Sequence, residues 1–534
     1  MTGIGKLLEQ QSLTRPQQAA IIDTLHGKSR MTNFDELREQ VDRAASRLLT
    51  AGIQHGDAVL VFQTMSVELY VALLAIFRVG AIAMFLDPSA GTRHIAQCCI
   101  MNPPKALIAS TRAHLLRLIC PPLNQIPVRF AIGGYIPNAI SWERLAERGS
   151  VDCTDPRLTV VLDKITEETP ALLTFTSGST GEPKAAMRTH GFLLSQQNVL
   201  SRSLNLTPTA LDMATLPIFV LANLASGVTS IIPDADLRRP SAINAARVIA
   251  QIDTYKPSTI AASPAFFERL VEFCETHTIT LPSLVTVFTG GAPVFPGLLD
   301  RLQQVAANAK IVAVYGSTEA EPIAHIDKSE IKESDYEAML SGHGLIAGRP
   351  VPEIKLRIIN HQWGSPIRPL SASEFESMLQ NTGEAGEIVV SGAHVLSGYL
   401  HGKGDEETKF QVDGIVWHRT GDSGTLDKQG RLWLLGRSSA RVHDADGILY
   451  PFAIETAAKS IPGIKRAALV ALGGRRVLVV EPDGKKQGNE LDVKAALEQF
   501  SWAKIAGLKL VAKIPVDKRH NAKVDYPALL KLMR

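Results

Sequence analysis

The segment from Thr176 to Lys184, T-S-G-S-T-G-E-P-K, combines hydroxyl side chains, glycines and one lysine. Glycines let a backbone approach phosphate oxygens closely, hydroxyl and amide groups donate hydrogen bonds to them, and lysine adds positive charge. The order of residues differs from the G-x-x-x-x-G-K-[ST] of a P-loop, and a flexible Gly/Ser linker is the alternative interpretation. We favour a phosphate-binding loop because the apolar strand Ala171–Phe175 directly precedes it. Its candidate ligands are Thr176, Ser177, Gly178, Ser179, Thr180, Gly181 and Lys184.

Two later segments repeat this arrangement of an apolar strand followed by small and polar residues. The strand Leu284–Phe288 leads into Thr289-Gly290-Gly291-Ala292-Pro293, and the strand Ile311–Tyr315 leads into Gly316-Ser317-Thr318-Glu319. Ligands of open α/β sheets bind beyond the carboxyl ends of the strands, so the three turns could line one crevice. Three unrelated surface turns are the alternative.

The elements that would position these turns alternate between helical and strand patterns. Asn33 can cap a helix, and Gly52 ends it. Beyond it we expect a helix at Ser66–Arg78 and strands at Ala58–Phe62, Ala81–Leu86 and Ala106–Ala109. Such alternation predicts an α/β fold with helices on the faces of its sheets. The apolar face of the first helix consists of Phe34, Leu37, Val41, Ala44 and Leu48.

The pattern changes close to Gly436, after an irregular connection at 361–385 and two further strands, Gly386–Ser391 and Arg431–Leu435. Beyond it the sequence predicts a small α+β unit that contains a β-hairpin with a Gly-Gly turn. Its expected elements are a helix near Pro451–Ser460, strands Lys465–Leu472 and Arg476–Glu481 joined by Gly473–Gly474, a helix Leu491–Phe500 and a strand Lys509–Ile514. We therefore predict a large domain over residues 1–436 and a small domain over 437–534.

The composition is that of an ordinary globular enzyme, with 45% hydrophobic and 20% charged residues in a chain of 534. A net charge of +3 is too small to argue for nucleic acid or membrane binding. The most apolar run, Tyr70–Leu86, is interrupted by Arg78 and Gly80, which favours a buried helix and strand over a membrane span. Five cysteines without C-x-x-C spacing, and no signal peptide, predict reduced thiols in the cytoplasm.

The motifs TSGSTGEPK, GGAP, YGSTE, TGD and GR, followed by a late lysine, occur in an order that resembles the acyl-adenylate-forming superfamily. This superfamily comprises acyl-CoA synthetases, luciferases and adenylation domains of nonribosomal peptide synthetases. WHRTGDSGTLDKQGRLWLLGR and RHNAKV are most similar to the fatty-acid–CoA-ligase-like group that includes β-lactone synthetases of olefin pathways. The resemblance implies a large multi-sheet N-terminal domain, a small mobile C-terminal domain and a two-step reaction through acyl-AMP.

The same resemblance implies a role for each matching residue. Thr176, Ser177, Ser179, Thr180 and Lys184 would hold the β- and γ-phosphates of ATP, Thr318 the α-phosphate, and Glu319 the Mg²⁺ ion. Gly291, Ala292 and Pro293 would line the adenine, with Tyr315 stacked on it and Gly316 and Ser317 in the same nucleotide-binding turn. Asp422 would bind the ribose hydroxyls, with Arg437 nearby, and Lys523 would be the adenylation lysine. Taken alone, Lys523 would be an exposed lysine in a basic tail.

Four positions depart from the family's pattern. Ala185 and Ala522 stand where glycine is usual, and Ala440 falls near the usual hinge residue, which leaves the pivot of domain rotation open. Val220 replaces a frequent histidine in the uncharged stretch Leu216–Ile231. Phe219, Val220, Leu221 and Leu224 therefore indicate either an apolar acyl pocket or plain core packing.

Three outcomes remain open from the sequence. The acyl group could pass to a thiol, of coenzyme A or of a carrier protein, since the last 34 residues carry a net charge of +6 that suits phosphates. It could instead be captured by a 3-hydroxyl of the substrate to give a β-lactone, which gains from intramolecular proximity. A nucleotide-binding protein without ligase activity is the third, although Thr318, Glu319, Asp422 and Lys523 are all present.

Overall fold

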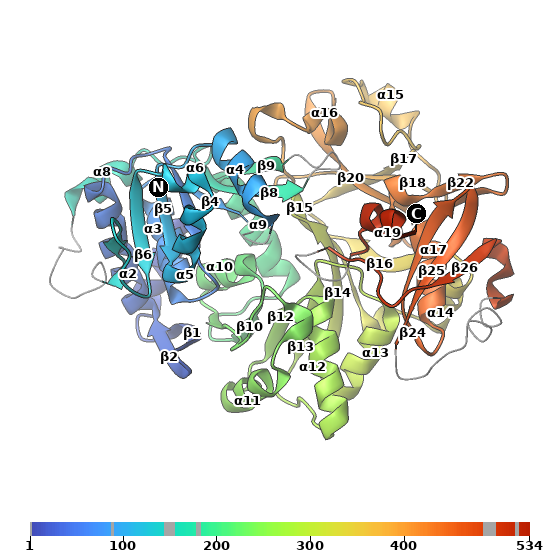
Figure 1. Cartoon of the computed structure of the whole chain (residues 1–534), viewed down its shortest axis with the longest axis horizontal. Helices are drawn as coiled ribbons and strands as arrows, with labels where there is room; N and C mark the ends of the chain where they lie inside the picture. Colours follow the sequence, from blue (N-terminus) through green and yellow to red (C-terminus); the bar gives the residue numbers. More distant parts are fainter. Residues whose placement is uncertain are drawn as a thin grey trace. The chain divides into compact units, whose positions relative to one another are not determined.

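A computed structural model describes residues 3–86, 90–143, 155–177, 183–483, 498–517 and 523–533 (Figure 1). The chain forms two compact units. The first consists of Met1–Ala235, Arg247–Ala261 and Gly398–Gly404, and the second of Asp236–Ala246, Ala262–Ser397 and Asp405–Arg534. None of the described helices has the length and apolar character that crossing a membrane requires. The expected domain boundary at residue 436 stays a prediction.

A seven-stranded sheet forms the centre of the first unit. In order across the sheet, its strands are β7 (Ile140–Ser141), β6 (Val128–Ile132), β5 (Ala106–Ser110), β3 (Ala58–Phe62), β4 (Ile82–Phe85), β8 (Pro170–Ser177) and β9 (Pro183–Thr189). Neighbouring strands are parallel except β8 and β9, which are antiparallel. The strands predicted from the sequence are confirmed here to within two residues at each end.

A second group of strands in the first unit has the order β12 (Thr259–Ala262), β10 (Leu211–Ala214), β11 (Thr229–Ile231), β1 (Ala19–Leu25) and β2 (Lys28–Asn33). The helices of this unit are α1 (Ile4–Thr14), α2 (Phe34–Thr50), α3 (Val67–Arg78), α4 (Thr92–Met101), α5 (Thr111–His114), α6 (Pro121–Asn124), α8 (Pro156–Leu162), α9 (His190–Ser203), α10 (Pro217–Ser226) and most of α11 (Ala245–Tyr255). The short 3-10 helices η2 (Leu115–Leu118) and η5 (Leu400–Gly402) also belong to it.

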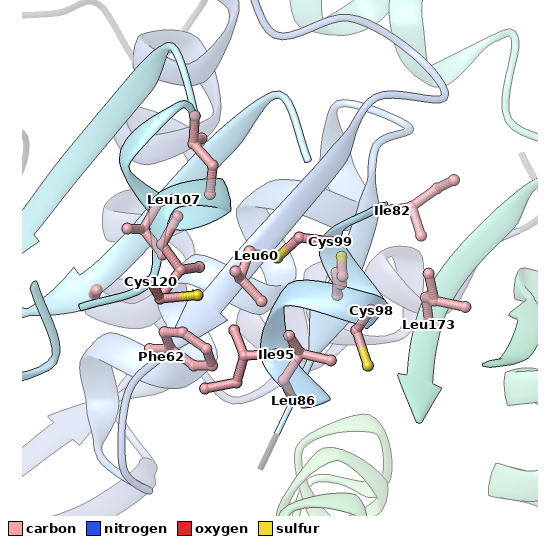
Figure 2. Packing of buried hydrophobic residues seen from close by; sticks show 14 of the residues in the cluster. Leu60, Phe62, Ile82, Leu86, Ile95, Cys98, Cys99, Leu107, Cys120 and Leu173 are labelled. Carbon is pink, nitrogen blue, oxygen red and sulfur yellow. The ribbon is translucent and has the colours of Figure 1, made fainter. Parts of the chain in front are cut away.

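Local signals account for the helix that the sequence placed first. Asn33 caps α2 through a capping box, in which its side chain accepts from the Glu36 N–H and the Glu36 side chain accepts from the Asn33 N–H. Figure 2 shows the core on one face of the seven-stranded sheet, where Ile95, Cys98 and Cys99 of α4 pack against Leu60 and other strand residues. The four described cysteines, Cys98, Cys99, Cys120 and Cys274, are free and buried.

The second unit contains a largely antiparallel group of strands. Their order is β17 (Lys355–Ile359), β18 (Gly386–Ser391), β20 (Ile415–Leu426), β21 (Leu432–Arg437), β16 (Leu345–Pro350), β15 (Ala320–Asp327), β14 (Lys310–Ser317) and β13 (Thr286–Gly290), with β19 (Lys409–Val412) paired to β20. Only β13 and β14 are parallel neighbours. The helices here are α12 (Pro264–His277), α13 (Pro296–Val305), α14 (Glu333–Leu340), α15 (Ala372–Glu376) and α16 (Asp405–Thr408), with 3-10 helices η3 (Pro240–Ala242), η4 (Lys328–Glu330) and η6 (Ser438–Ala440).

The C-terminal part of the second unit is the predicted α+β arrangement, with two corrections. It contains β22 (Val442–Asp444), β23 (Gly447–Leu449), α17 (Pro451–Lys459), β24 (Ile464–Leu472), β25 (Arg475–Pro482), β26 (Gly507–Leu510) and α19 (Tyr526–Met533). The strand expected at Lys509–Ile514 is wrong at both ends, because β26 pairs with β25 from Gly507 to Leu510 only. Of the helix expected at Leu491–Phe500, residues 491–497 lie outside the described residues, and Glu498–Ala503 forms a 3-10 helix, η7.

Candidate functional site

Tyr315, Asp422 and Arg437 lie together in the second unit. They come from β14, β20 and β21, and Asp422 and Arg437 are register partners. Tyr315 Oη donates a 2.8 Å hydrogen bond to Asp422 Oδ2, and Arg437 Nε lies 3.4 Å from Asp422 Oδ1. Burial, and then the Asp422 carboxylate, raises the pKa of Tyr315 well above its ordinary value. The Asp422 side chain is 21% exposed, so the carboxylate remains accessible to a ligand hydroxyl.

The Thr318–Glu319 turn lies at the end of β14, where it joins β15. The Leu396 N–H donates to the Glu319 carbonyl at 2.7 Å, and the Glu319 N–H donates to Ser317 Oγ at 3.3 Å. The negative charge of Glu319 contributes to raising the pKa of Arg437, although Asp422 contributes more. The carboxylate of Glu319 is therefore within electrostatic reach of the Tyr315–Asp422–Arg437 group.

Two of the three small-residue turns that the sequence singled out share one sheet edge. Gly291, Ala292 and Pro293 follow β13, and Gly316 to Glu319 belong to the end of β14, its parallel neighbour. At Gly290 a Cβ atom would lie 2.7 Å from the Val314 carbonyl oxygen, so only glycine permits this approach of the two strands. The third turn follows β8 in the other unit.

A buried polar pair, Lys409 and His418, lies beside this turn and was not among the residues predicted from the sequence. Lys409 Nζ lies 3.1 Å from His418 Nδ1 and donates to the carbonyl of Leu396, whose N–H holds Glu319. Burial lowers the pKa of Lys409 to about 8, against the opposing charge of Glu319. Burial and Lys409 lower the pKa of His418 to about 3, so this imidazole is neutral. Lys409 thus supports the turn through Leu396.

Asp413 and Gly414 were the signal that could have revealed this pair. Both have positive φ, of 46° and 79°, as a two-residue hairpin turn requires. Counting outward from such a turn pairs Lys409 with His418, which is the register observed between β19 and β20.

The residues of the turn fit a magnesium ion that is shared with a polyphosphate. Glu319 and Thr318 offer a carboxylate and a hydroxyl, which are the oxygen donors that Mg²⁺ prefers. Across the described ranges, no group of three or more His, Cys, Asp or Glu residues could hold a metal ion. Mg²⁺ commonly takes one or two carboxylates and completes its coordination with phosphate oxygens and water. The donor set therefore suits a nucleotide-bound ion.

Lys523 directly precedes Val524, which forms an antiparallel bridge with Val516 shortly before α19. The Lys523 N–H donates to Asp517 Oδ1 at 2.9 Å, and its carbonyl accepts from the Asp517 N–H at 2.8 Å. Three residues further on, Tyr526 Oη donates to the buried Glu455 Oε1 at 2.7 Å. Tyr526 also contributes to the pKa of Arg437, which brings the start of α19 within electrostatic reach of the Tyr315–Asp422–Arg437 group.

The candidate phosphate ligands belong to the first unit. Thr176 and Ser177 end β8, and Thr176 is the register partner of Lys184 on β9. Residues 178–182 lie outside the described residues, and they include the candidates Gly178, Ser179, Thr180 and Gly181. Lys184 is 9% exposed, and its Nζ lies 5.9 Å from the centre of the Tyr399 ring. The predicted strand before the loop is confirmed, and the antiparallel pairing of β8 with β9 shows a second strand after it.

The four candidate acyl-pocket residues, Phe219, Val220, Leu221 and Leu224, all belong to α10 and are buried. Pro217 begins this helix and Gly227, in the left-handed region, ends it. Burial of this kind suits the wall of a filled pocket and core packing equally, so both interpretations stay open.

Comparison with known proteins adds four similarities. Residues 8–400 match the family described as AMP-binding enzyme. The chain is 30% identical over 513 residues to an olefin beta-lactone synthetase of Stenotrophomonas maltophilia, covering 92% of this chain and 89% of that protein. It is 25% identical over 512 residues to the putative acyl–CoA ligase YdaB of Bacillus subtilis, covering 94% and 95%. A crystal structure of an anthranilate CoA ligase with anthranoyl-AMP has a TM-score of 0.81 at 16% identity, covering 99% and 97%, which confirms the predicted fold class.

Proposed function

The chain belongs to the AMP-binding enzyme family, and on that premise we propose that it uses ATP to convert an apolar carboxylic acid into acyl-AMP and pyrophosphate. The resemblance to acyl-adenylate-forming enzymes that the motifs predicted is confirmed by the family match and by the Stenotrophomonas relative. The observation that carries the proposal is the grouping of the Thr318–Glu319 turn with Tyr315, Asp422 and Arg437 in one unit.

In the first step, a carboxylate oxygen of the acid attacks the α-phosphorus of ATP, and the bond from that phosphorus to the oxygen bridging to the β-phosphate breaks. Asp422 accepts hydrogen bonds from the ribose hydroxyls, since its carboxylate is partly exposed and anchored by Tyr315 and Arg437. Gly291, Ala292 and Pro293 lie beside the adenine, and Tyr315 packs on it. Thr318 binds the α-phosphate, and Lys184 with the loop at 176–181 binds the β- and γ-phosphates.

Attack of one anion on another requires positive charge at the reacting oxygens. We assign this role to Lys523, whose ammonium gains most when negative charge develops in the transition state. The bonds to Asp517 hold the backbone of Lys523 itself, and the bond from Tyr526 to Glu455 anchors the chain three residues further on. Mg²⁺, when bound with ATP at Glu319, supplies further charge neutralisation on the phosphates.

For the second step, the similarity to an olefin beta-lactone synthetase over 92% of the chain supports capture by a 3-hydroxyl of the substrate. The hydroxyl oxygen would bond to the acyl carbon, its proton would leave, and AMP would depart to give a β-lactone. The similarity to YdaB supports the alternative, in which the thiol of coenzyme A or of a carrier protein takes the acyl group. Free, buried thiols at the four described cysteines support a cytoplasmic location for either reaction.

Product analysis tests the proposal. The protein is incubated with ATP, Mg²⁺ and a 3-hydroxy fatty acid, with and without coenzyme A, and the products are identified by mass spectrometry. AMP together with the dehydrated acid in the absence of coenzyme A supports the lactone route, and acyl-CoA formed only with coenzyme A supports the thiol route. Nucleotide binding without any acid-dependent formation of AMP would refute the ligase function.

A further inference from the structure

The acidic residues of the chain are unevenly distributed. The sequence contains 53 Asp and Glu among 534 residues, yet none occurs from residue 88 to residue 142. An even distribution would place about five there. The same stretch carries Arg93, Lys105, Arg112, Arg117 and Arg129. The small net charge of the whole chain therefore conceals a segment of the first unit that lacks acidic residues and carries a net charge of +5.

Three large aliphatic side chains protrude from the middle of this segment. Leu115, Leu118 and Ile119 are 59%, 83% and 64% exposed, on η2 and directly after it. The residues on either side of this group are buried: His114 is 3% exposed, and Cys120 belongs to the core shown in Figure 2. A single exposed leucine is ordinary, but three within five consecutive residues form an apolar tip that this unit leaves uncovered.

Two arginines lie beside this tip and converge on one residue. Arg117 Nη2 donates to Asn124 Oδ1 at 3.2 Å, and Arg129 Nη2 donates to the Asn124 carbonyl at 2.6 Å. Burial, and then the neighbouring Arg129, lowers the pKa of Arg117, as expected for two guanidinium groups held close together. Both arginines donate to uncharged oxygens of Asn124, and among the described residues neither forms an ion pair with a carboxylate. The pair therefore offers unneutralised positive charge to an anion.

We propose that the Leu115–Ile119 surface, defined as Leu115, Leu118 and Ile119 with Arg117 and Arg129, binds the face of an anionic phospholipid bilayer. Apolar tips at this kind of surface insert at the boundary between headgroups and acyl chains, and neighbouring arginines bind the phosphates. A bilayer matches both parts of this surface, because its acyl chains accommodate the aliphatic side chains and its phosphates match the arginines. Attachment of this kind needs no membrane-crossing helix.

Vesicle flotation tests this inference with the full chain and without any enzyme assay, so it succeeds or fails independently of the proposed function. The vesicles consist either of phosphatidylcholine alone or of phosphatidylcholine with phosphatidylglycerol. We expect the wild type to float with the anionic vesicles, more weakly at high salt, and not with the neutral ones. Absence of flotation, or equal flotation with both compositions, would overturn the proposal.

Variants locate the binding surface. Arg117→Gln with Arg129→Gln should weaken binding about 25-fold, from roughly fivefold for each cation near a charged membrane. Leu118→Ser with Ile119→Ser should weaken it at least about tenfold through lost insertion. The matched control, Leu13→Ser with Val160→Ser, removes two aliphatic side chains of the same unit that are 77% and 58% exposed, and should bind like the wild type. Wild-type binding by both test variants would contradict the assignment.

Two further readouts exclude other occupants. A Leu118→Trp variant should show increased quenching by brominated lipids relative to the wild type, and unchanged quenching would contradict insertion at this position. Self-association that the Leu118→Ser/Ile119→Ser variant abolishes, without vesicle binding, would assign the surface to a second copy and overturn the proposal.

Discussion

Replacement of Glu455 by glutamine should stabilise the protein at neutral and alkaline pH. Glu455 lies on α17, is 3% exposed, and uses one oxygen, Oε1, to accept from the Leu469 N–H at 2.8 Å and from Tyr526 Oη at 2.7 Å. Burial raises the pKa of this carboxyl to about 7 from 4.5, although both hydrogen bonds favour the ionised form. Glutamine keeps an oxygen at this place and removes the buried charge.

The sign and size of the effect follow from the two pKa values. Between the unfolded pKa and the folded pKa, the folded state binds more protons than the unfolded state, so stability falls as pH rises through the window from 4.5 to about 7. A difference of 2.5 units, each equivalent to 1.36 kcal/mol, gives about 3 kcal/mol. The Glu455→Gln variant should therefore gain about 3 kcal/mol over the wild type as pH rises from about 4 to about 8.

Equilibrium urea unfolding, followed by tryptophan fluorescence at several pH values, measures this difference. Glu374→Gln is the matched control, because Glu374 is an exposed carboxylate whose pKa is lowered by Arg368 to about 2, which gives the opposite sign. If the wild type and the Glu455→Gln variant show parallel pH dependence, then Glu455 is not a buried, desolvated carboxyl and the reasoning fails.

Three other predictions concern the strands around the site and the metal. Arg419→Met should lower the free energy of unfolding, measured in urea titrations, by about 3–5 kcal/mol. The variant leaves the buried carboxylate of Glu387 without its partner, because the two side chains form an ion pair at 2.7 Å and are only 1–2% exposed. A much smaller loss would show that the pair is hydrated. Asp422→Asn should raise KM for ATP about tenfold or more through weakened bonds to the ribose, and an unchanged KM would remove Asp422 from the nucleotide site. Chelation of divalent cations should abolish formation of AMP, and added Mg²⁺ should restore it; activity that persists in a chelator would contradict the role of Glu319.

Local signals in the sequence predicted much of the fold. Strand β3 and strand β18 have the predicted bounds, and Asn33 caps α2 as expected. The Gly473–Gly474 turn joins β24 to β25, with positive φ at both glycines. Each of these features depends on residues that are neighbours in sequence, so composition and spacing suffice to identify it.

Contacts between distant segments could not be predicted in this way. The bond between Tyr526 and Glu455 joins residues 71 apart, and Tyr315 meets Asp422 across 107 residues. The motif order implied the second pairing only through a family resemblance. β26 ends at Leu510 because its pairing with β25 ends, which no apolar pattern in Lys509–Ile514 reveals.

Acid-dependent exchange of labelled pyrophosphate into ATP tests the central claim most directly. With Mg²⁺ and a panel of fatty and 3-hydroxy fatty acids, the wild type should catalyse exchange only when a suitable acid is present. Lys523→Ala should reduce the rate of exchange about 100-fold or more, because it removes a positive charge that stabilises the transition state. The same variant should leave ATP binding intact. Lys531→Ala, in the same C-terminal segment, should retain the rate. Exchange that no acid stimulates, or that Lys523→Ala leaves unchanged, would contradict the account.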